Sequence, residues 1–340
     1  MLTILSTLLL VLPSLIGNTY ALPQRNRNGG NANQGGTGQG KGQASTRVTT
    51  ATDGSSILDT TVNVNGVPLR FKVSGPASEF TTLTSVTGAS SAPNSTGKLG
   101  LNVLLHGDGG QSFFDFPNQA VQGNLMGVVV LAPSEQLLWG QRTGPPSGLS
   151  RPDGAADSQA VRDLVKQVLP QVIAFDPANV FFTGVSGGSL TLSGFFIPAH
   201  LSEFPNTGVL LMCGGLVPQV DVVDAAGFIT NSKIHFQSTQ QELELLQPAI
   251  PAAIKAYEAL AAGQGLNARQ IGALQTVDNT PNGGHCEFDE AGFSSGIQLI
   301  SNNFASIMQG GNGAVQGINA KTVLKSVVGN ENLKFAAAAA

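Results

Sequence analysis

Short apolar segments alternate with segments of helical periodicity over residues 99–308, and this alternation constrains the fold more than any other feature of the chain. The apolar segments predict strands at 99–105, 127–133, 179–185, 208–213, 233–238 and 271–277. Helical spacing of apolar residues predicts helices at 113–124, after Asp157, through Phe196, at 242–262 and at 288–308. Such alternation is typical of a mostly parallel sheet with helices on both faces, so the expected fold class is α/β.

Residues 56–73 precede this region and have the pattern of an antiparallel hairpin. Residues 58–64 alternate in polarity, and the Asn65-Gly66 dipeptide after them is typical of a two-residue turn. We expect this hairpin at one edge of the sheet. The span 47–335 is long enough to fold as one large domain around a full core.

The N-terminal residues have the pattern of a secretory signal. Residues 2–16 are nearly all apolar, and Thr19 and Ala21 stand at the positions that a signal peptidase reads. The apolar run is too short to span a membrane. We therefore expect a signal peptide at 1–21, a disordered leader rich in Gly, Asn and Gln at 22–46, and a secreted, extracellular protein without a membrane partner.

Charge and cysteine content limit the partners and the compartment. Only 11% of the residues are charged and the net charge is -4, so we expect no nucleic-acid partner. The two cysteines, Cys213 and Cys286, predict one disulfide in an oxidising compartment, although two separate buried thiols remain an alternative. The sequon at Asn94 predicts N-glycosylation on a loop rich in Ser, Pro and Gly.

The pentapeptide Gly184-Val185-Ser186-Gly187-Gly188 follows an apolar strand and leads into a helical segment. A serine on such a strand-to-helix turn stands exposed at the end of a sheet, where a histidine can accept its proton. The flanking glycines allow the tight turn, because a side chain there would clash. The context predicts that Ser186 is a catalytic nucleophile.

The base must come from one of four histidines. His106 lies in a glycine-rich turn, His200 follows a helix and is expected at the surface, and His235 alternates within a strand and is expected to be packed. His285 lies in a loop after the last predicted strand. The chain order Ser, acid, His favours His285 as the base. A disulfide from Cys286 to Cys213 would tie this loop to the sheet.

The acid is expected after the strand that precedes the long helix, at the edge of the sheet where Ser186 lies. Glu242 falls in the turn before that helix and is the first candidate to orient the imidazole. The alternative interpretation is that Glu242 is a first-turn residue whose charge complements the helix dipole and that has no catalytic role. Glu244 is its near neighbour, and Asp221 and Asp224, after the preceding strand, are alternatives.

Attack by a serine on an ester or amide places negative charge on the carbonyl oxygen, and two N–H groups must be aimed at it. The N–H of Gly187, directly after the nucleophile, is one expected donor. The turn His106-Gly107-Asp108-Gly109-Gly110 is the expected source of the second, with the Asp108 N–H as first choice. An ordinary glycine turn is the alternative, whereas a phosphate loop is disfavoured because no lysine follows.

These features together resemble the α/β-hydrolase superfamily and, within it, the secreted feruloyl and acetylxylan esterases and poly(3-hydroxybutyrate) depolymerases. The motifs that carry the resemblance are Leu104-Leu105-His106-Gly107, the loop 139–153, Asp163, the run 176–180 before the Ser186 turn, and Gly284-His285. The branch has Asp as its usual acid, where this chain has Glu242. An acidic residue such as Asp108 is also unusual so near a developing oxyanion and is expected to point away from it.

The resemblance implies a serine esterase that forms an acyl-enzyme on Ser186 and acts on a small or polymeric ester. The low charge content and the expected secretion favour a plant polysaccharide ester or a polyester as the substrate. Trp139 is expected to line the acyl or sugar pocket. No cofactor or metal is expected, because no His, Cys and Asp cluster has ligand spacing. Alternatives are another serine hydrolase, such as a lipase, cutinase or peptidase, and a non-catalytic binding or surface protein on the same scaffold.

Overall fold

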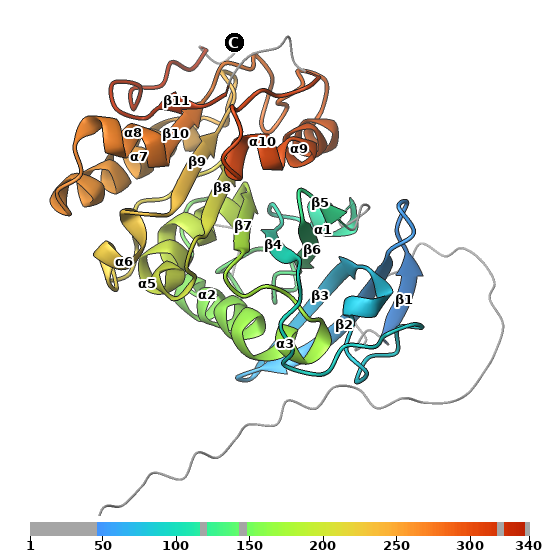
Figure 1. The fold of residues 1–340 in the computed structure, drawn as a ribbon. Coiled ribbons are helices and arrows are strands. Elements are labelled where there is room, and N and C mark those ends of the chain that lie inside the picture. The colour runs from blue at the N-terminus through green and yellow to red at the C-terminus, as the bar shows by residue number, and fades with distance from the viewer. Residues whose placement is uncertain (1–45, 116–120, 143–147, 318–322, 337–340) are drawn as a thin grey trace, which may run out of the picture.

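The protein is described from a computed structural model that covers residues 46–115, 121–142, 148–317 and 323–336. The expected signal peptide and almost all of the leader lie outside the described residues. One mixed sheet crosses the molecule, with helices on both sides of it (Figure 1). Its strands are β1 (Arg47–Thr50), β2 (Ser56–Val64), β3 (Val67–Gly75), β4 (Gly100–Leu105), β5 (Val121–Gln122), β6 (Leu125–Val130), β7 (Val180–Val185), β8 (Gly208–Met212), β9 (Lys233–Gln237), β10 (Gln275–Asp278) and β11 (Lys325–Ser326).

The strand order is β1-β2-β3-β6-β4-β7-β8-β9-β10-β11, and β5 pairs with β6. The strands from β6 to β10 in this order are parallel, whereas β1, β2 and β3 pair antiparallel at one edge. The α/β class and the N-terminal hairpin are therefore confirmed. β4 and β7 are neighbours in the sheet. After β4 the chain goes to β6, on the side of β4 away from β7, and after β7 it goes to β8, on the side of β7 away from β4. This reversal is a topological switch point, where open α/β sheets bind their ligands.

The helical elements cover the sheet in two layers. They are η1 (Ala77–Glu79), α1 (Gln111–Asp115), α2 (Gly154–Asp163), η2 (Leu164–Val168), α3 (Leu169–Val172), α4 (Gly187–Thr191), η3 (Leu192–Phe196), α5 (Ile197–His200), η4 (Leu201–Glu203), α6 (Ala225–Ile229), α7 (Leu246–Gly263), α8 (Ala268–Leu274), α9 (Phe293–Asn302) and α10 (Phe304–Met308). Alternate residues of β7 face opposite layers: Phe182 belongs to the core cluster that includes residues of α2, α5 and α7, and Phe181 belongs to the one that includes residues of α9 and α10. Within the described residues, no helix is both long and apolar enough to cross a membrane.

Four predicted elements are placed differently. The helix expected at 113–124 is only α1, and Val121 and Gln122 form β5 instead. The strand expected at 271–277 is mostly α8, because the Asn267 side chain and Gln270 form a reciprocal capping box that starts a helix there. The long helix begins at Leu246 rather than Glu242. The closing helix begins only after Gly292 and is divided into α9 and α10.

Candidate active site

Ser186 lies on the turn between β7 and α4, with φ 48° and ψ -112°. A positive φ is strained for a residue with a side chain, and such strain concentrates at functional sites. The glycines on either side permit the turn. A Cβ on Gly184 would lie 2.6 Å from the Ser189 backbone, and a Cβ on Gly188 would lie 2.1 Å from the Leu105 carbonyl oxygen. The sequence around Ser186 therefore dictates a turn that presents the hydroxyl at the switch point.

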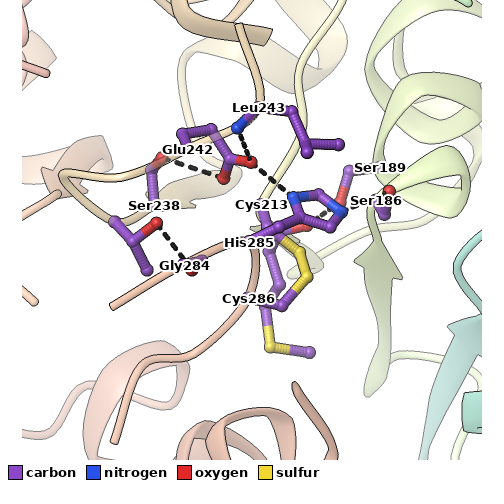
Figure 2. The surroundings of a disulfide bond; sticks show 11 residues. Ser186, Ser189, Cys213, Ser238, Glu242, Leu243, Gly284, His285 and Cys286 are labelled. Atoms are coloured by element: carbon purple, nitrogen blue, oxygen red, sulfur yellow. Dashed lines mark hydrogen bonds and ion pairs between the residues drawn. A yellow bond between two sulfur atoms is a disulfide. The ribbon is translucent and has the colours of Figure 1, made fainter. Parts of the chain in front are cut away.

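His285 reaches Ser186 from the loop that follows β10. Its Nε2 lies 2.9 Å from Ser186 Oγ, and its Nδ1 hydrogen-bonds Glu242 Oε1. Figure 2 shows the imidazole between the hydroxyl and the carboxylate. Because Nδ1 faces a carboxylate, the proton of the neutral ring resides on Nδ1 and Nε2 is left to accept from the serine.

Glu242 lies in the loop between β9 and α7, and its side chain is fully buried. Oε1 also accepts a hydrogen bond of 2.8 Å from the Leu243 N–H, and Oε2 lies 3.4 Å from Ser238 Oγ. These contacts fix the carboxylate toward the imidazole. The alternative acids are elsewhere: Glu244 and Asp221 are exposed, and the exposed Asp224 caps α6 through the Gly227 N–H.

The disulfide between Cys213 and Cys286 joins the end of β8 to the residue after the candidate base. It links positions 73 residues apart, with their Cα atoms 5.2 Å from each other. The bond lies beside the imidazole (Figure 2). His285 and the two sulfurs lie within 4.8 Å of one another, but the sulfurs are bonded and provide no thiolate ligand for a metal.

The turn after β4 lies beside Ser186: a Cβ on Gly107 would lie 3.3 Å from Ser186 Cβ. Neither the Asp108 N–H nor the Gly187 N–H has an acceptor among the described residues. His106 holds the turn: its Nε2 accepts from the Ala132 N–H at 2.9 Å, and its Nδ1 donates to the Gly107 carbonyl at 2.6 Å. Burial lowers the pKa of His106 to about 4, so the ring stays neutral and keeps both bonds at neutral pH.

Two sequence-based expectations about side chains are wrong. Trp139 is fully buried and packs 5.4 Å from the His106 ring, so it supports the turn from within the core rather than lining a pocket. His200 is not at the surface but 9% exposed, packed edge-on against Phe196. His235 is buried within the sheet as expected, between Thr276 and Gln237.

The Asp108 side chain packs against Gly187, the residue after Ser186, and so does not point away from this part of the site. A Cβ on Gly187 would lie 2.0 Å from Asp108 Oδ1, so the carboxylate packs against that glycine. Asp108 Oδ2 instead accepts a hydrogen bond of 2.7 Å from Nη2 of Arg151, whose side chain is 2% exposed. No motif in the sequence marks Arg151 as part of the site. The only available signal was that a carboxylate in this turn requires a cation to offset its charge.

The strand order, the switch point between β4 and β7 and the strained serine after β7 together define the α/β-hydrolase fold. No protein-family model matches the chain, and no curated protein matches its sequence.

Solved structures with a similar arrangement include esterases and a depolymerase. An arylesterase is 10% identical, with a TM-score of 0.43 over 74% of this chain and 85% of its own. The poly(3-hydroxybutyrate) depolymerase LpqC from Bordetella parapertussis is 15% identical, with a TM-score of 0.41 over 74% of this chain and 89% of its own. A thermostable esterase is 15% identical, with a TM-score of 0.42 over 67% of this chain and only 55% of its own.

Proposed function

We propose that the protein is a secreted serine esterase that hydrolyses carboxylic esters through an acyl-enzyme on Ser186. The observation that carries this proposal is the continuous hydrogen-bonded chain from Ser186 Oγ through His285 to the buried carboxylate of Glu242. A serine hydroxyl is a weak nucleophile at neutral pH and requires such a base and orienting acid.

Each residue has a defined task in the proposed reaction. Ser186 Oγ attacks the ester carbonyl carbon while His285 Nε2 accepts the hydroxyl proton. Glu242 holds the Nδ1–H and stabilises the imidazolium that forms. The N–H groups of Asp108 and Gly187 stabilise the negative charge on the carbonyl oxygen.

The tetrahedral intermediate then expels the alcohol, which takes the proton from His285 Nε2, and the acyl group remains on Ser186. In the second half, a water molecule gives a proton to Nε2 and attacks the acyl carbonyl carbon. Collapse of this second intermediate returns the proton to Ser186 Oγ and releases the carboxylic acid. No step requires a metal or an organic cofactor.

The disulfide and the low charge content support a secreted protein, because disulfides persist in oxidising compartments. Asn94 is exposed and accepts a hydrogen bond of 2.6 Å from Gln171 Nε2, which leaves its amide nitrogen accessible to a glycan. The proposal therefore includes glycosylation at Asn94. A loss of mass on treatment of the secreted protein with an N-glycosidase tests it.

Covalent labelling tests the proposed nucleophile. A fluorophosphonate probe reacts with serines activated by a neighbouring base, so it is expected to label the wild-type protein on Ser186 and to leave Ser186→Ala unlabelled. Peptide mapping identifies the labelled residue. A wild-type protein that resists the probe would favour a non-catalytic binding protein on the same scaffold.

A further inference from the structure

The carboxylate of Asp108 occupies a position beside the proposed nucleophile that neither the triad nor the oxyanion donors account for. One oxygen, Oδ2, binds Arg151, and the other, Oδ1, lies against the Cα atom of Gly187. The side chain is 33% exposed, so it borders solvent next to the turn that carries Ser186. Its location places a hydrogen-bond acceptor next to the scissile ester.

Arg151 holds this carboxylate from the interior of the protein. Its side chain is 2% exposed, and its Nε has no acceptor among the described residues. The contact with Asp108 is therefore the main compensation for a buried guanidinium, and losing it would leave an unpaired buried charge. The hydrogen bond from Arg151 fixes the position of Oδ2, and Oδ1 therefore faces Gly187.

The two oxygens of Asp108 differ in what they can bind. Oδ2 is engaged with Arg151, whereas no described residue donates a hydrogen bond to Oδ1. Water can satisfy Oδ1 in the free protein because the side chain borders solvent. A bound ester displaces that water, and an acceptor left without a donor weakens binding.

The net charge of the Asp108–Arg151 pair determines which kind of substrate group can donate a hydrogen bond to Oδ1. Asp108 is negative and Arg151 is positive at a separation of 2.7 Å, so the pair has no net charge. A cationic substrate group would gain little from a neutral pair and would lie near the guanidinium. A neutral hydroxyl can donate to Oδ1 without this repulsion, and a second carboxylate cannot donate at all.

We propose that Asp108 is a specificity-determining residue that selects esters with a free hydroxyl close to the scissile bond, as in partly acylated sugars and polyols. This inference rests on the proposed esterase function and refines it, because it favours polysaccharide-type esters over polyesters whose repeating units carry no donor. Arg151 is the positioning residue that orients the carboxylate and offsets its charge.

A matched pair of esters tests this selection without any substitution. Glycerol 1-monobutyrate and propyl butyrate have the same acyl group and the same alcohol carbon count, and differ in the two hydroxyls. Each kcat/KM is divided by the rate of alkaline hydrolysis of that ester to remove the difference in leaving group. A hydrogen bond to a charged acceptor predicts that wild type prefers the hydroxylated ester by about ten- to a hundredfold. Equal normalised values in wild type would overturn the inference.

The Asp108→Asn variant tests the residue. Its amide oxygen can accept from Arg151, which leaves an NH₂ donor where Oδ1 lies. A substrate hydroxyl can accept from this NH₂ group, but only in a neutral hydrogen bond, so the preference is expected to fall to about a few-fold at most. The ratio is compared within each variant, and Asp221→Asn, at an exposed aspartate, is the matched control expected to keep the wild-type ratio. A wild-type ratio in folded Asp108→Asn, verified by its thermal unfolding, would also overturn the inference.

Hydrolysis of a short-chain nitrophenyl ester separates the two levels of the proposal. If wild type hydrolyses this ester and Ser186→Ala does not, equal normalised values for the butyrate pair would overturn only the hydroxyl selection. If wild type hydrolyses none of the three esters, the proposed esterase function itself fails, and the selection fails with it.

Discussion

His285 Nε2 lies 2.9 Å from Ser186 Oγ, although 99 residues separate the two in the chain. The parallel sheet makes this contact possible, because β7 and β10 end at the same edge and the turn after one faces the loop after the other. The buried Glu242, after β9, completes the line. Substitution of each residue that holds this contact is therefore expected to change kcat or the free energy of unfolding.

Glu242→Gln is expected to lower kcat by about a thousand- to ten-thousandfold, because the amide cannot stabilise the imidazolium and permits the wrong tautomer of His285. Glu242→Asp is expected to lose less, since it keeps the charge but shortens the reach. Hydrolysis of a nitrophenyl ester measures both. The matched control is Glu244→Gln at the exposed neighbour, which should retain wild-type turnover. A near-normal kcat in Glu242→Gln, together with a large loss in Asp221→Asn or Asp224→Asn, would reassign the acid.

Replacing both cysteines, as Cys213→Ala with Cys286→Ala, is expected to lower the free energy of unfolding by about 4 kcal/mol, because the bond closes a 73-residue loop in the unfolded chain. The same variant should lose kcat, since Cys286 directly follows the base. Urea unfolding and steady-state kinetics measure the two effects. Unchanged values for both would show that the loop is held without the disulfide.

Arg151→Met is expected to lower kcat about tenfold or more, because it leaves the Asp108 carboxylate without its cation beside the developing oxyanion. Adding Asp108→Asn to Arg151→Met should restore much of the loss, which a purely structural role of Arg151 would not produce. Arg70→Met is the control, because Arg70 pairs with Asp59 within the N-terminal hairpin and not with a residue of the candidate site. Independent, additive losses from the two substitutions would contradict the electrostatic interpretation.

Two buried histidines predict a loss of stability in acid. Burial lowers the pKa of His106 to about 4 and that of His235 to about 4, from 6.5 in the unfolded chain. Between these values the unfolded chain binds protons that the folded protein does not, so the free energy of unfolding falls as the pH decreases. The expected loss is about 3 kcal/mol per histidine between pH 6.5 and pH 4.

Urea unfolding at a series of pH values measures this slope. His235→Asn removes one of these two groups, so its slope over the same range should be smaller than that of wild type. A wild-type unfolding free energy that stays constant from pH 6.5 to pH 4 would contradict the assignment.

The sequence predicted those parts of the site that depend on local pattern. The Ser186 turn follows from its glycines and flanking apolar strand, and the Asn65-Gly66 hairpin follows from its dipeptide. Other features depend on tertiary contacts. The pairing of Asp108 with Arg151 spans 43 residues, and no local pattern predicts it. The apolar residues of α8 predict a strand, but the capping box at Asn267 outweighs them and starts a helix.

The burial of Trp139 is a second feature that the sequence pattern did not predict. Its position in a Gly- and Pro-rich loop favours a surface role, yet the ring is enclosed against His106. Burial of a large aromatic side chain gives more free energy than exposure in a pocket mouth, and only the folded chain reveals whether space exists for it.

If Ser186 is the nucleophile of an esterase, the kcat for a short-chain nitrophenyl ester must differ sharply between wild type and Ser186→Ala. Removal of the nucleophile is expected to lower kcat by about a millionfold, leaving only the contribution of the oxyanion donors and of binding. Equal rates for the two proteins would contradict the account.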